Sequence, residues 1–220
     1  MQDYQLELID LALARSALRF GTFRLKSGRE SPYFFEAGLL VSDGAAAAAL
    51  GRCYAAALQS SGLEFDMLFG PAYKGIPLAT TTAIALAQQY RRSVPYAFNR
   101  KEAKDHGEGG RIVGAPLSGR VVIVDDVISD GGAKREAIEL IRAAGAQAVG
   151  VLLALDRQER GAGERSALED LQARYGLRCV SIVTLDELIE ALAQTHAGRP
   201  RISVEQLTQL RAYRERYGAA

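Results

Sequence analysis

Apolar residues along this chain fall into short continuous runs separated by longer stretches with helical spacing. The run Val121–Val124 contains four β-branched residues in succession and ends at two aspartates, a pattern typical of a strand buried on both faces of a parallel sheet. Apolar residues then recur at helical spacing as far as Gly145, at Ala133, Ala137, Ile138, Ile141 and Ala144. This segment therefore predicts a strand, a short loop and a helix, in that order.

The rest of the chain shows the same alternation, without an internal repeat. Further strands are predicted at Phe65–Phe69, Val94–Phe98, Ala148–Leu155 and Cys179–Val183, and further helices at Tyr4–Ala17, from a Ser42 cap to about Ser60, through Pro77 to about Tyr90, and at Ala167–Tyr175. Two last helices open at capping boxes, Thr184 with Glu187 and Ser203 with Gln206. The alternation predicts a single α/β domain over residues 1–220, with a doubly wound parallel sheet and flanking helices.

Charge and hydropathy exclude several classes of partner. The chain carries 27 lysines and arginines against 26 acidic residues, a net charge of +1. No global field therefore favours nucleic acid or an anionic membrane, and neither is expected as a partner. The alanine-rich stretch Ala45–Leu58 is interrupted by Arg52, so it predicts a core helix rather than a membrane span.

The cysteines and histidines carry little sign of metal or redox chemistry. Cys53 and Cys179 lie far apart in apolar surroundings without a C-x-x-C partner, so we expect two reduced core residues. The first residues show no secretory signal, and together these features predict a cytoplasmic protein. His106 and His196 have no metal-ligand neighbours at suitable spacing, which argues against a structural zinc site.

The loop after the Val121–Val124 strand predicts an anion-binding site. Free backbone N–H groups and the helix dipole point into such a loop, and Gly131 and Gly132 let the backbone approach a ligand closely. Asp125 and Asp126, expected at a solvent-facing strand end, suit the hydroxyl groups of a sugar or a bridging Mg²⁺. A ligand with both a phosphate and a diol, such as a phosphorylated ribose, satisfies both halves. The alternative is a strand followed by a solvated acidic turn.

Two further charged segments follow strands at the same predicted sheet edge, where ligands of such folds bind. The Gly70–Gly75 loop opens a helix and offers Lys74 as a point charge for phosphate, although a tight turn with a surface lysine is the alternative. The long, charged and glycine-rich segment Asn99–Gly114 predicts a mobile lid. Loop statistics alone favour the alternative, a solvated hairpin connection.

Near the N-terminus, Phe20–Gly38 predicts a short hairpin that turns at Ser27–Arg29 and carries aromatic residues at Tyr33–Phe35. By pattern alone this is a small β element packed on the core. Resemblance to a known family changes that interpretation.

Residues Val121–Lys134 resemble the signature with which type I phosphoribosyltransferases bind PRPP (phosphoribosyl pyrophosphate). Hairpin residues 26–28 and 31–35, the loop 72–75, the lid 100–107 and Asp156 with Arg157 are similar to the orotate phosphoribosyltransferase family, over about residues 1–190. The resemblance implies the type I phosphoribosyltransferase fold. It divides the chain into a small N-terminal hood, mainly residues 1–40 with the C-terminal helices, a catalytic core at about 42–185 and a lid at about 99–114.

The same resemblance implies a reaction, transfer of the phosphoribosyl group from PRPP to orotate, which gives orotidine 5′-monophosphate and pyrophosphate in de novo pyrimidine biosynthesis. It implies Mg²⁺ as the cofactor, bound mainly through PRPP and without an assigned protein ligand. It also implies a homodimer in which Lys101 contributes to the neighbouring site. Lys104, Asp125 and Asp126 are the implied catalytic residues.

The implied ligand contacts come from every segment named above. For PRPP they are Lys26, Tyr73, Lys74, Arg100, Lys101, Lys104, His106, Asp125, Asp126, Val127, Ile128, Ser129, Asp130, Gly131, Gly132 and Ala133. For orotate they are Lys26, Phe34, Phe35, Ser129 and Arg157. A non-proline cis peptide bond is implied at Ala72–Tyr73, where it would aim backbone amides at the pyrophosphate.

The phosphate loop departs from the family's more usual Thr-Ala-Gly-Thr, because it reads Ser129-Asp130-Gly131-Gly132. Ser129 keeps a hydroxyl group and Gly132 loses one. Asp130 places a carboxylate beside the phosphate, which is unfavourable unless its side chain points away or pairs with Lys134.

Two alternatives remain open on sequence. One is a phosphoribosyltransferase for a purine base or another pyrimidine, which the hairpin motif disfavours. The other is a PRPP-sensing regulator without turnover, which would usually carry an added DNA-binding segment or a basic face. No P-loop or dinucleotide-binding glycine motif occurs, so an ATPase or a dehydrogenase is not supported.

Overall fold

The computed structural model describes residues 1–25, 27–104, 110–128, 131–161, 163–196 and 198–219, with the backbone alone for residues 103, 104, 110 and 196. Four predicted contact residues, Lys26, His106, Ser129 and Asp130, therefore lie outside the described residues. For Lys104 the structure gives the position in a strand but no side-chain contacts.

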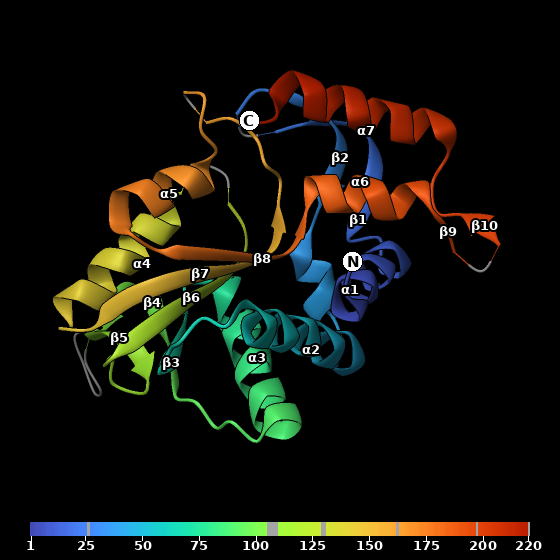
Figure 1. Ribbon diagram of the computed structural model, residues 1–220. Helices are drawn as coiled ribbons and strands as arrows, with labels where there is room; N and C mark the ends of the chain where they lie inside the picture. Colours follow the sequence, from blue (N-terminus) through green and yellow to red (C-terminus); the bar gives the residue numbers. More distant parts are fainter. Residues whose placement is uncertain (26, 105–109, 129–130, 162, 197, 220) are drawn as a thin grey trace.

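A six-stranded sheet of order β5-β4-β3-β6-β7-β8 forms the centre of the molecule (Figure 1). Its strands are β3 (Met67–Gly70), β4 (Tyr96–Lys104), β5 (Gly110–Gly114), β6 (Arg120–Val127), β7 (Gln147–Asp156) and β8 (Arg178–Thr184). All neighbours are parallel except β5, which runs antiparallel to β4 at the edge. The predicted parallel sheet is confirmed, with one antiparallel edge strand added.

That edge strand corrects the prediction that β4 ends at Phe98. The strand continues through Lys104, and Phe98 and Asn99 pair with Val113 and Ile112 of β5. Both arms of the predicted lid are therefore strand, as in the hairpin alternative. A polar edge hairpin has no continuous apolar run, so its sequence looks like a loop although its backbone is paired.

Helices cover both faces of the sheet, as a doubly wound fold requires. On one face lie α1 (Asp3–Ala14), α2 (Gly44–Ser61), α3 (Gly75–Tyr90) and α6 (Leu185–Ala193), and on the other lie α4 (Gly132–Ala143) and α5 (Ala167–Tyr175) (Figure 1). Val122 and Val124 of β6 pack into the first layer, whereas Val121 and Ile123 pack into the second. Successive strand residues point to opposite faces, so a strand with two covered faces must be apolar throughout.

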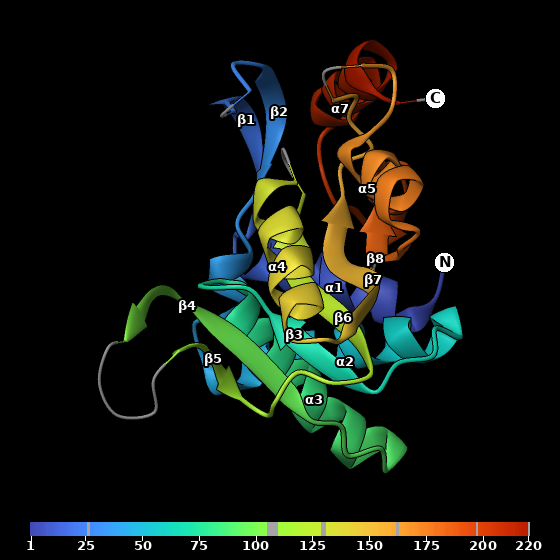
Figure 2. The ribbon, with the colours of Figure 1, turned by 90° about the vertical axis from the view of Figure 1, so that its left-hand side faces the viewer.

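The N-terminal hairpin and the C-terminal helix lie at the same end of the molecule (Figure 2). The predicted N-terminal hairpin is confirmed as β1 (Leu18–Arg24) and β2 (Glu30–Phe35), and a short 3-10 helix (Ala37–Val41) leads from it into α2. Figure 2 shows this hairpin at the same end as α7 (Val204–Tyr217). The rings of Tyr33 in β2 and Tyr213 in α7 contact edge to face at 6.0 Å between centroids. Two antiparallel strands of two residues each, β9 (Thr195–His196) and β10 (Arg199–Pro200), lie between α6 and α7.

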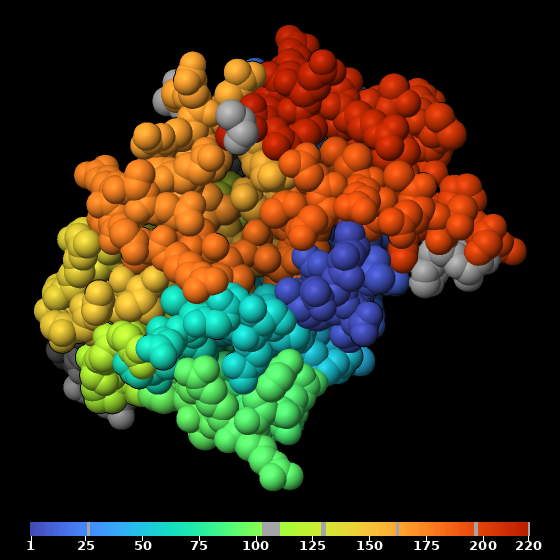
Figure 3. Space-filling view, in the orientation of Figure 1, coloured from blue at the N-terminus to red at the C-terminus, as the bar shows by residue number. Residues whose placement is uncertain are grey.

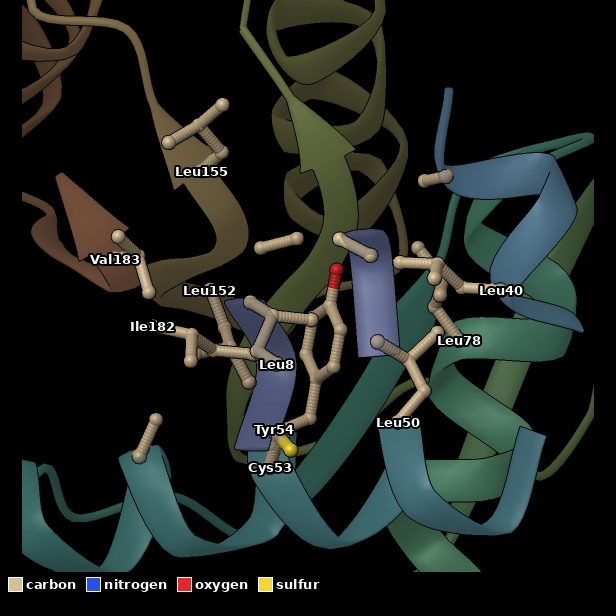
Figure 4. Close-up of a cluster of buried hydrophobic side chains, with 14 of the residues drawn as sticks. Leu8, Leu40, Leu50, Cys53, Tyr54, Leu78, Leu152, Leu155, Ile182 and Val183 are labelled. Carbon is tan, nitrogen blue, oxygen red and sulfur yellow. The ribbon is translucent and has the colours of Figure 1, made fainter. Parts of the chain in front are cut away.

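One buried tyrosine ties the helical layer to the end of the central strand. Tyr54 of α2 is fully buried among leucines, and its hydroxyl points away from the helix, as Figure 4 shows. The hydroxyl donates a hydrogen bond of 2.8 Å to the backbone carbonyl of Asp125. The polar atom of this buried side chain is thus placed where the sheet offers a carbonyl acceptor.

The two cysteines are free and lie in different layers. Cys53 belongs to the cluster around α2, and Cys179 packs against the cluster around α5, so the sheet separates them. Within the described ranges, no helix has the length and apolar character needed to span a membrane.

Two predicted helix boundaries are wrong. Helix α1 ends at Ala14 rather than Ala17, because β1 begins at Leu18 and the intervening residues turn the chain. Helix α2 is capped by Asp43 rather than Ser42: the Asp43 carboxylate accepts a 2.9 Å hydrogen bond from the Ala46 amide and pairs with Arg15. Ser42 instead donates to the Leu39 carbonyl. Both residue types can cap a helix, and only the backbone direction decides between neighbours.

This cap makes a direct prediction about stability. Asp43→Ala leaves the Ala46 amide without its side-chain acceptor and should lower the melting temperature by about 3 °C. The matched control, Ser42→Ala, should change it by less than about 1 °C. Thermal unfolding followed by circular dichroism measures both, and equal effects would mean that Asp43 does not act as the cap.

Candidate active site

Two adjacent carboxylates stand near the carboxyl end of β6. Asp125 is 6 % exposed and Asp126 is 4 % exposed, so the expectation of solvent-facing side chains is wrong. The Asp125 carboxylate accepts a 2.9 Å hydrogen bond from the Asp126 amide, and the Asp126 carboxylate accepts one of 2.8 Å from the Val127 amide. Each carboxylate also forms an ion pair with a lysine, because burying a charged carboxylate without a partner would destabilise the fold by several kcal/mol.

The partner of Asp125 is Lys134, in the first turn of α4. Its ammonium lies 2.5 Å from the Asp125 carboxylate and donates a 2.6 Å hydrogen bond to the Val127 carbonyl. Both side chains are buried, at 7 % and 9 % exposure. Burial raises the pKa of Asp125, the neighbouring Asp126 raises it further, and Lys134 opposes both effects. The sequence suggested Lys134 only as a possible partner of Asp130, so its pairing with Asp125 was not predicted.

The partner of Asp126 is Lys74, in the loop between β3 and α3. The two groups are 2.7 Å apart, but the Lys74 side chain is 58 % exposed. Burial disfavours the charged form of Lys74, yet the hydrogen bond and charge of Asp126 outweigh it and raise its pKa. This bridge brings two segments predicted separately, the aspartate pair and the glycine-bearing loop, into one site.

Close packing holds that loop against β6. A Cβ atom on Gly75 would lie 2.8 Å from the Val124 carbonyl oxygen and 2.6 Å from Pro71 Cδ, so the position has room for glycine only. The Ala72–Tyr73 peptide bond is cis, as predicted. The Ala72 amide donates a 2.9 Å hydrogen bond to the side chain of Asn99, a buried residue of β4 that sequence reasoning missed.

The outer wall of the site comes from β4. Within the described part of the chain, Arg100 has a buried guanidinium nitrogen, Nη1, without a hydrogen-bond partner. Buried donors are normally paired, so this nitrogen marks a place where an anion would be favourable. The Lys101 ammonium lies 4.8 Å from the centre of the Tyr73 ring, which is 65 % exposed. Lys101 and Tyr73, two of the predicted PRPP contacts, therefore lie side by side in the same chain.

The start of α4 supplies backbone for an anion. Gly131 has a φ of 72° at the position that caps the helix, a conformation that glycine adopts without strain. Gly132 and Ala133 form the first turn, where the positive end of the helix dipole lies. Ile128 is buried in the hydrophobic layer around α4, so it can offer a ligand its backbone only.

Arg157 follows β7 at the same sheet edge and reaches toward the N-terminal hairpin. Its guanidinium stacks on the Tyr33 ring at 4.2 Å and pairs with Glu159 at 2.6 Å. Phe34 is half-buried, and its ring contacts that of Phe23 at 5.5 Å. Phe35 is buried in the core, so its side chain faces away from the surface on which Phe34 lies.

A separate cavity of about 130 Å³ lies on the face drawn in Figure 3, lined by residues of β7, α5, β8 and α7, among them Asp156, Glu169, Ser181 and Arg214. None of its lining residues belongs to the predicted PRPP or orotate contacts.

Taken together, the β6 end offers carboxylates for hydroxyl groups, lysines for phosphates and a helix start for a second anion. That combination suits a phosphorylated sugar.

The buried pair makes a prediction about stability. Lys134→Met removes the cation that compensates Asp125 and should lower the free energy of unfolding by about 3–5 kcal/mol. Arg142→Met is the matched control, because it removes only an exposed ion pair with Glu139 and a cation–π contact with Tyr175 and should cost less than about 1.5 kcal/mol. Adding Asp125→Asn to Lys134→Met should restore part of the loss. Urea unfolding measures all three, and a loss no larger than that of the control would contradict the buried-pair assignment.

Comparison with known proteins agrees with this geometry. The family model of the phosphoribosyl transferase domain matches residues 41–172. Orotate phosphoribosyltransferases from Klebsiella pneumoniae and Pseudomonas paraeruginosa are each 58 % identical over 218 residues, covering 99 % of this chain and 100 % of theirs. The crystal structure of orotate phosphoribosyltransferase from Francisella tularensis superposes with a TM-score of 0.83 at 35 % identity, covering 96 % of this chain and 98 % of that one. The chain belongs to the orotate phosphoribosyltransferase family of type I phosphoribosyltransferases.

Proposed function

We propose that this chain transfers the phosphoribosyl group from PRPP to orotate, giving orotidine 5′-monophosphate and pyrophosphate in de novo pyrimidine biosynthesis. Family membership over nearly the full length supports the reaction. The observation that carries the site assignment is the Lys74–Asp126 bridge, which joins the carboxylates to the loop expected to hold pyrophosphate. The exposed Lys74 ammonium suits the pyrophosphate of PRPP, and the buried Asp126 carboxylate suits the ribosyl group from which the pyrophosphate departs.

PRPP would lie across the carboxyl ends of β3, β4 and β6. The loop from Ser129 to Ala133 would take the 5′-phosphate, the aspartates the ribose diol, and Tyr73, Lys74 and Arg100 the pyrophosphate. Lys26, Lys101, Lys104 and His106 would complete the pyrophosphate contacts. Because Lys74 is exposed, it can leave Asp126 for a pyrophosphate oxygen, and the freed carboxylate oxygen can accept a ribose hydroxyl.

Mg²⁺ fits this site as an ion carried by PRPP. Among the residues that the structure describes, no group of three or more His, Cys, Asp or Glu side chains could hold a metal, and both aspartates are already paired with lysines. Mg²⁺ retains bound water readily and is often held through substrate phosphates. When bound, it would supply charge neutralisation for the pyrophosphate oxygens.

Orotate would lie between the N-terminal hairpin and Arg157. Its carboxylate suits the Arg157 guanidinium, and its planar ring suits an aromatic neighbour such as Phe34. Lys26, Ser129 and the backbone at Phe35 would complete the contacts. This arrangement keeps the residues 1–40 and the C-terminal helices as a hood over a core at about 42–185.

The chemistry is displacement of pyrophosphate from the anomeric carbon by the orotate ring nitrogen, through a cationic, oxocarbenium-like state. No protein nucleophile is needed, so catalysis rests on positioning and charge. Asp125 and Asp126 stabilise the ribosyl cation. Lys104 neutralises the departing pyrophosphate while the lid, at about 99–114, excludes water that would hydrolyse PRPP.

The enzyme acts as a cytoplasmic homodimer in this proposal. Free thiols in both core layers support a reducing compartment. Lys101 would contribute to the neighbouring subunit's site. Its contact with Tyr73 favours a competing arrangement, in which Lys101 serves the site of its own chain.

An assay of orotate consumption with PRPP and Mg²⁺ tests the reaction, with purine bases as controls. In it, Asp126→Asn should lower kcat/KM for PRPP by about a hundredfold or more, because the amide is a weaker acceptor and carries no charge toward the ribosyl cation. The single change suits the test, since its lysine partner is exposed and can be solvated. Glu139→Gln, exposed on α4, is the control. A folded Asp126→Asn enzyme with normal activity would contradict the assignment, and turnover of purine bases in place of orotate would contradict the reaction.

Mixed dimers test whether Lys101 acts in trans. One protein carries Lys101→Ala and the other Asp126→Asn, and subunits are exchanged between them. If Lys101 completes the neighbouring site, a mixed dimer contains one intact site, and activity should rise above the sum of the separate proteins. If Lys101 serves its own chain, each site of the mixed dimer keeps one defect, and no recovery follows even where heterodimers are demonstrated.

A further inference from the structure

The guanidinium of Arg157 is held from one side by a buried polar cluster. Glu159 accepts from Arg157 Nε at 2.7 Å, and Ser31 and the Tyr213 hydroxyl lie 3.1 and 3.5 Å from Nη2. Ser31 is 1 % exposed and Tyr213 is 5 % exposed, so the cluster is enclosed by protein. Nη1, the remaining donor group, has no hydrogen-bond partner among the described residues.

Tyr213 completes this cluster from the far end of the sequence. Its hydroxyl donates a 2.8 Å hydrogen bond to the same Glu159 oxygen that accepts from Arg157. The backbone reinforces the contact, because the Arg160 amide donates to the Tyr217 carbonyl at 2.9 Å and the Ala219 amide donates to the Gln158 carbonyl at 2.8 Å. Helix α7 is thus joined to the segment that carries Arg157 by both side-chain and backbone bonds.

We infer that Glu159 and Tyr213 are positioning residues for orotate: they fix the Arg157 guanidinium so that its Nη1 edge faces the base carboxylate. A flexible arginine side chain loses rotamer entropy when its guanidinium binds an anion. A guanidinium that is already held in place loses less. The C-terminal helix is therefore part of the base-binding site, although none of its residues needs to touch the base. The inference rests on the proposed function, in which Arg157 binds orotate.

Replacing Glu159 distinguishes a positioning role from a purely electrostatic one. Its negative charge opposes the binding of an anionic base, so a simple field argument predicts tighter binding when the charge is removed. The positioning argument predicts the reverse for Glu159→Ala, because both Arg157 and Tyr213 then lose their common acceptor. Glu159→Gln keeps an oxygen at that place and should behave nearly like the natural enzyme.

Steady-state kinetics with separate KM values for orotate and PRPP test the inference. Tyr213→Phe should raise the orotate KM about fivefold, and Glu159→Ala about tenfold. Glu159→Gln should stay within about twofold, and in every variant kcat and the PRPP KM should change by less than about twofold. Tyr217→Phe is the matched control, since it keeps the ring that contacts Tyr213 and removes a hydroxyl, one turn away on the same helix, that has no hydrogen-bond partner among the described residues. Thermal unfolding of each variant verifies the fold.

Arg157→Ala separates the two levels of the argument. If this change leaves the orotate KM unaltered, the proposed orotate contact is wrong. If it raises that KM about tenfold or more while Tyr213→Phe behaves like Tyr217→Phe, the contact stands and the positioning role is overturned. A lower orotate KM in Glu159→Ala would also overturn it. Adding Tyr213→Phe to Arg157→Ala should have no further effect, because a positioning residue acts through the group that it positions.

Discussion

The burial of two adjacent carboxylates near the end of β6 is the constraint on which the site depends. Like charges in a low-dielectric environment repel strongly, so each carboxylate requires a cation and backbone donors of its own. Lys134 arrives from the helix after the strand, and Lys74 arrives from the loop after the neighbouring strand. Tyr54 meets the same strand end from the helical layer below. Three separate elements are thereby fixed relative to one strand end.

The Asp125–Lys134 and Asp126–Lys74 ion pairs differ in their exposure to solvent, and they therefore have different roles. Asp125 and Lys134 are both buried, so their separation would leave a charge unsolvated, and the pair acts as a permanent part of the fold. Lys74 is largely exposed, so its bond to Asp126 can be exchanged for a bond to a ligand at little cost. A rigid carboxylate beside an exchangeable one suits a site that must hold a sugar and release an anion.

A third ion pair, Arg157 with Glu159, repeats the same logic on the base side. It joins the N-terminal hairpin, the segment after β7 and the C-terminal helix, which are far apart in the sequence. The N-terminal hairpin and the C-terminal helix therefore lie over the same edge of the sheet. Because the contact is made by residues outside the parallel core, the base side can be shaped by the chain ends without changing the strands that hold the phosphates.

Much of the fold was predictable from local pattern. The β6 run, the capping boxes of α5, α6 and α7 in the structure, and the glycine loops are determined by residues within one turn or one strand of each other, and the capping boxes predicted at Thr184 and Ser203 are confirmed. The edge strand β5 and the true cap of α2 were not predictable in this way. Strand pairing at an edge depends on a partner segment, and a cap depends on backbone direction, neither of which a local pattern contains.

The sequence by itself determined which residues bring charge, hydroxyl groups and glycine to the carboxyl edge of the sheet, because strand and helix periodicity places the loops there. Tertiary structure decided how those charges and the neighbouring polar groups pair. Lys134 with Asp125, Lys74 with Asp126, Asn99 with Ala72 and Tyr213 with Glu159 are contacts between separate elements. Such pairs are selected by burial, since only in the folded chain does removal from water make an unpaired charge or polar group costly.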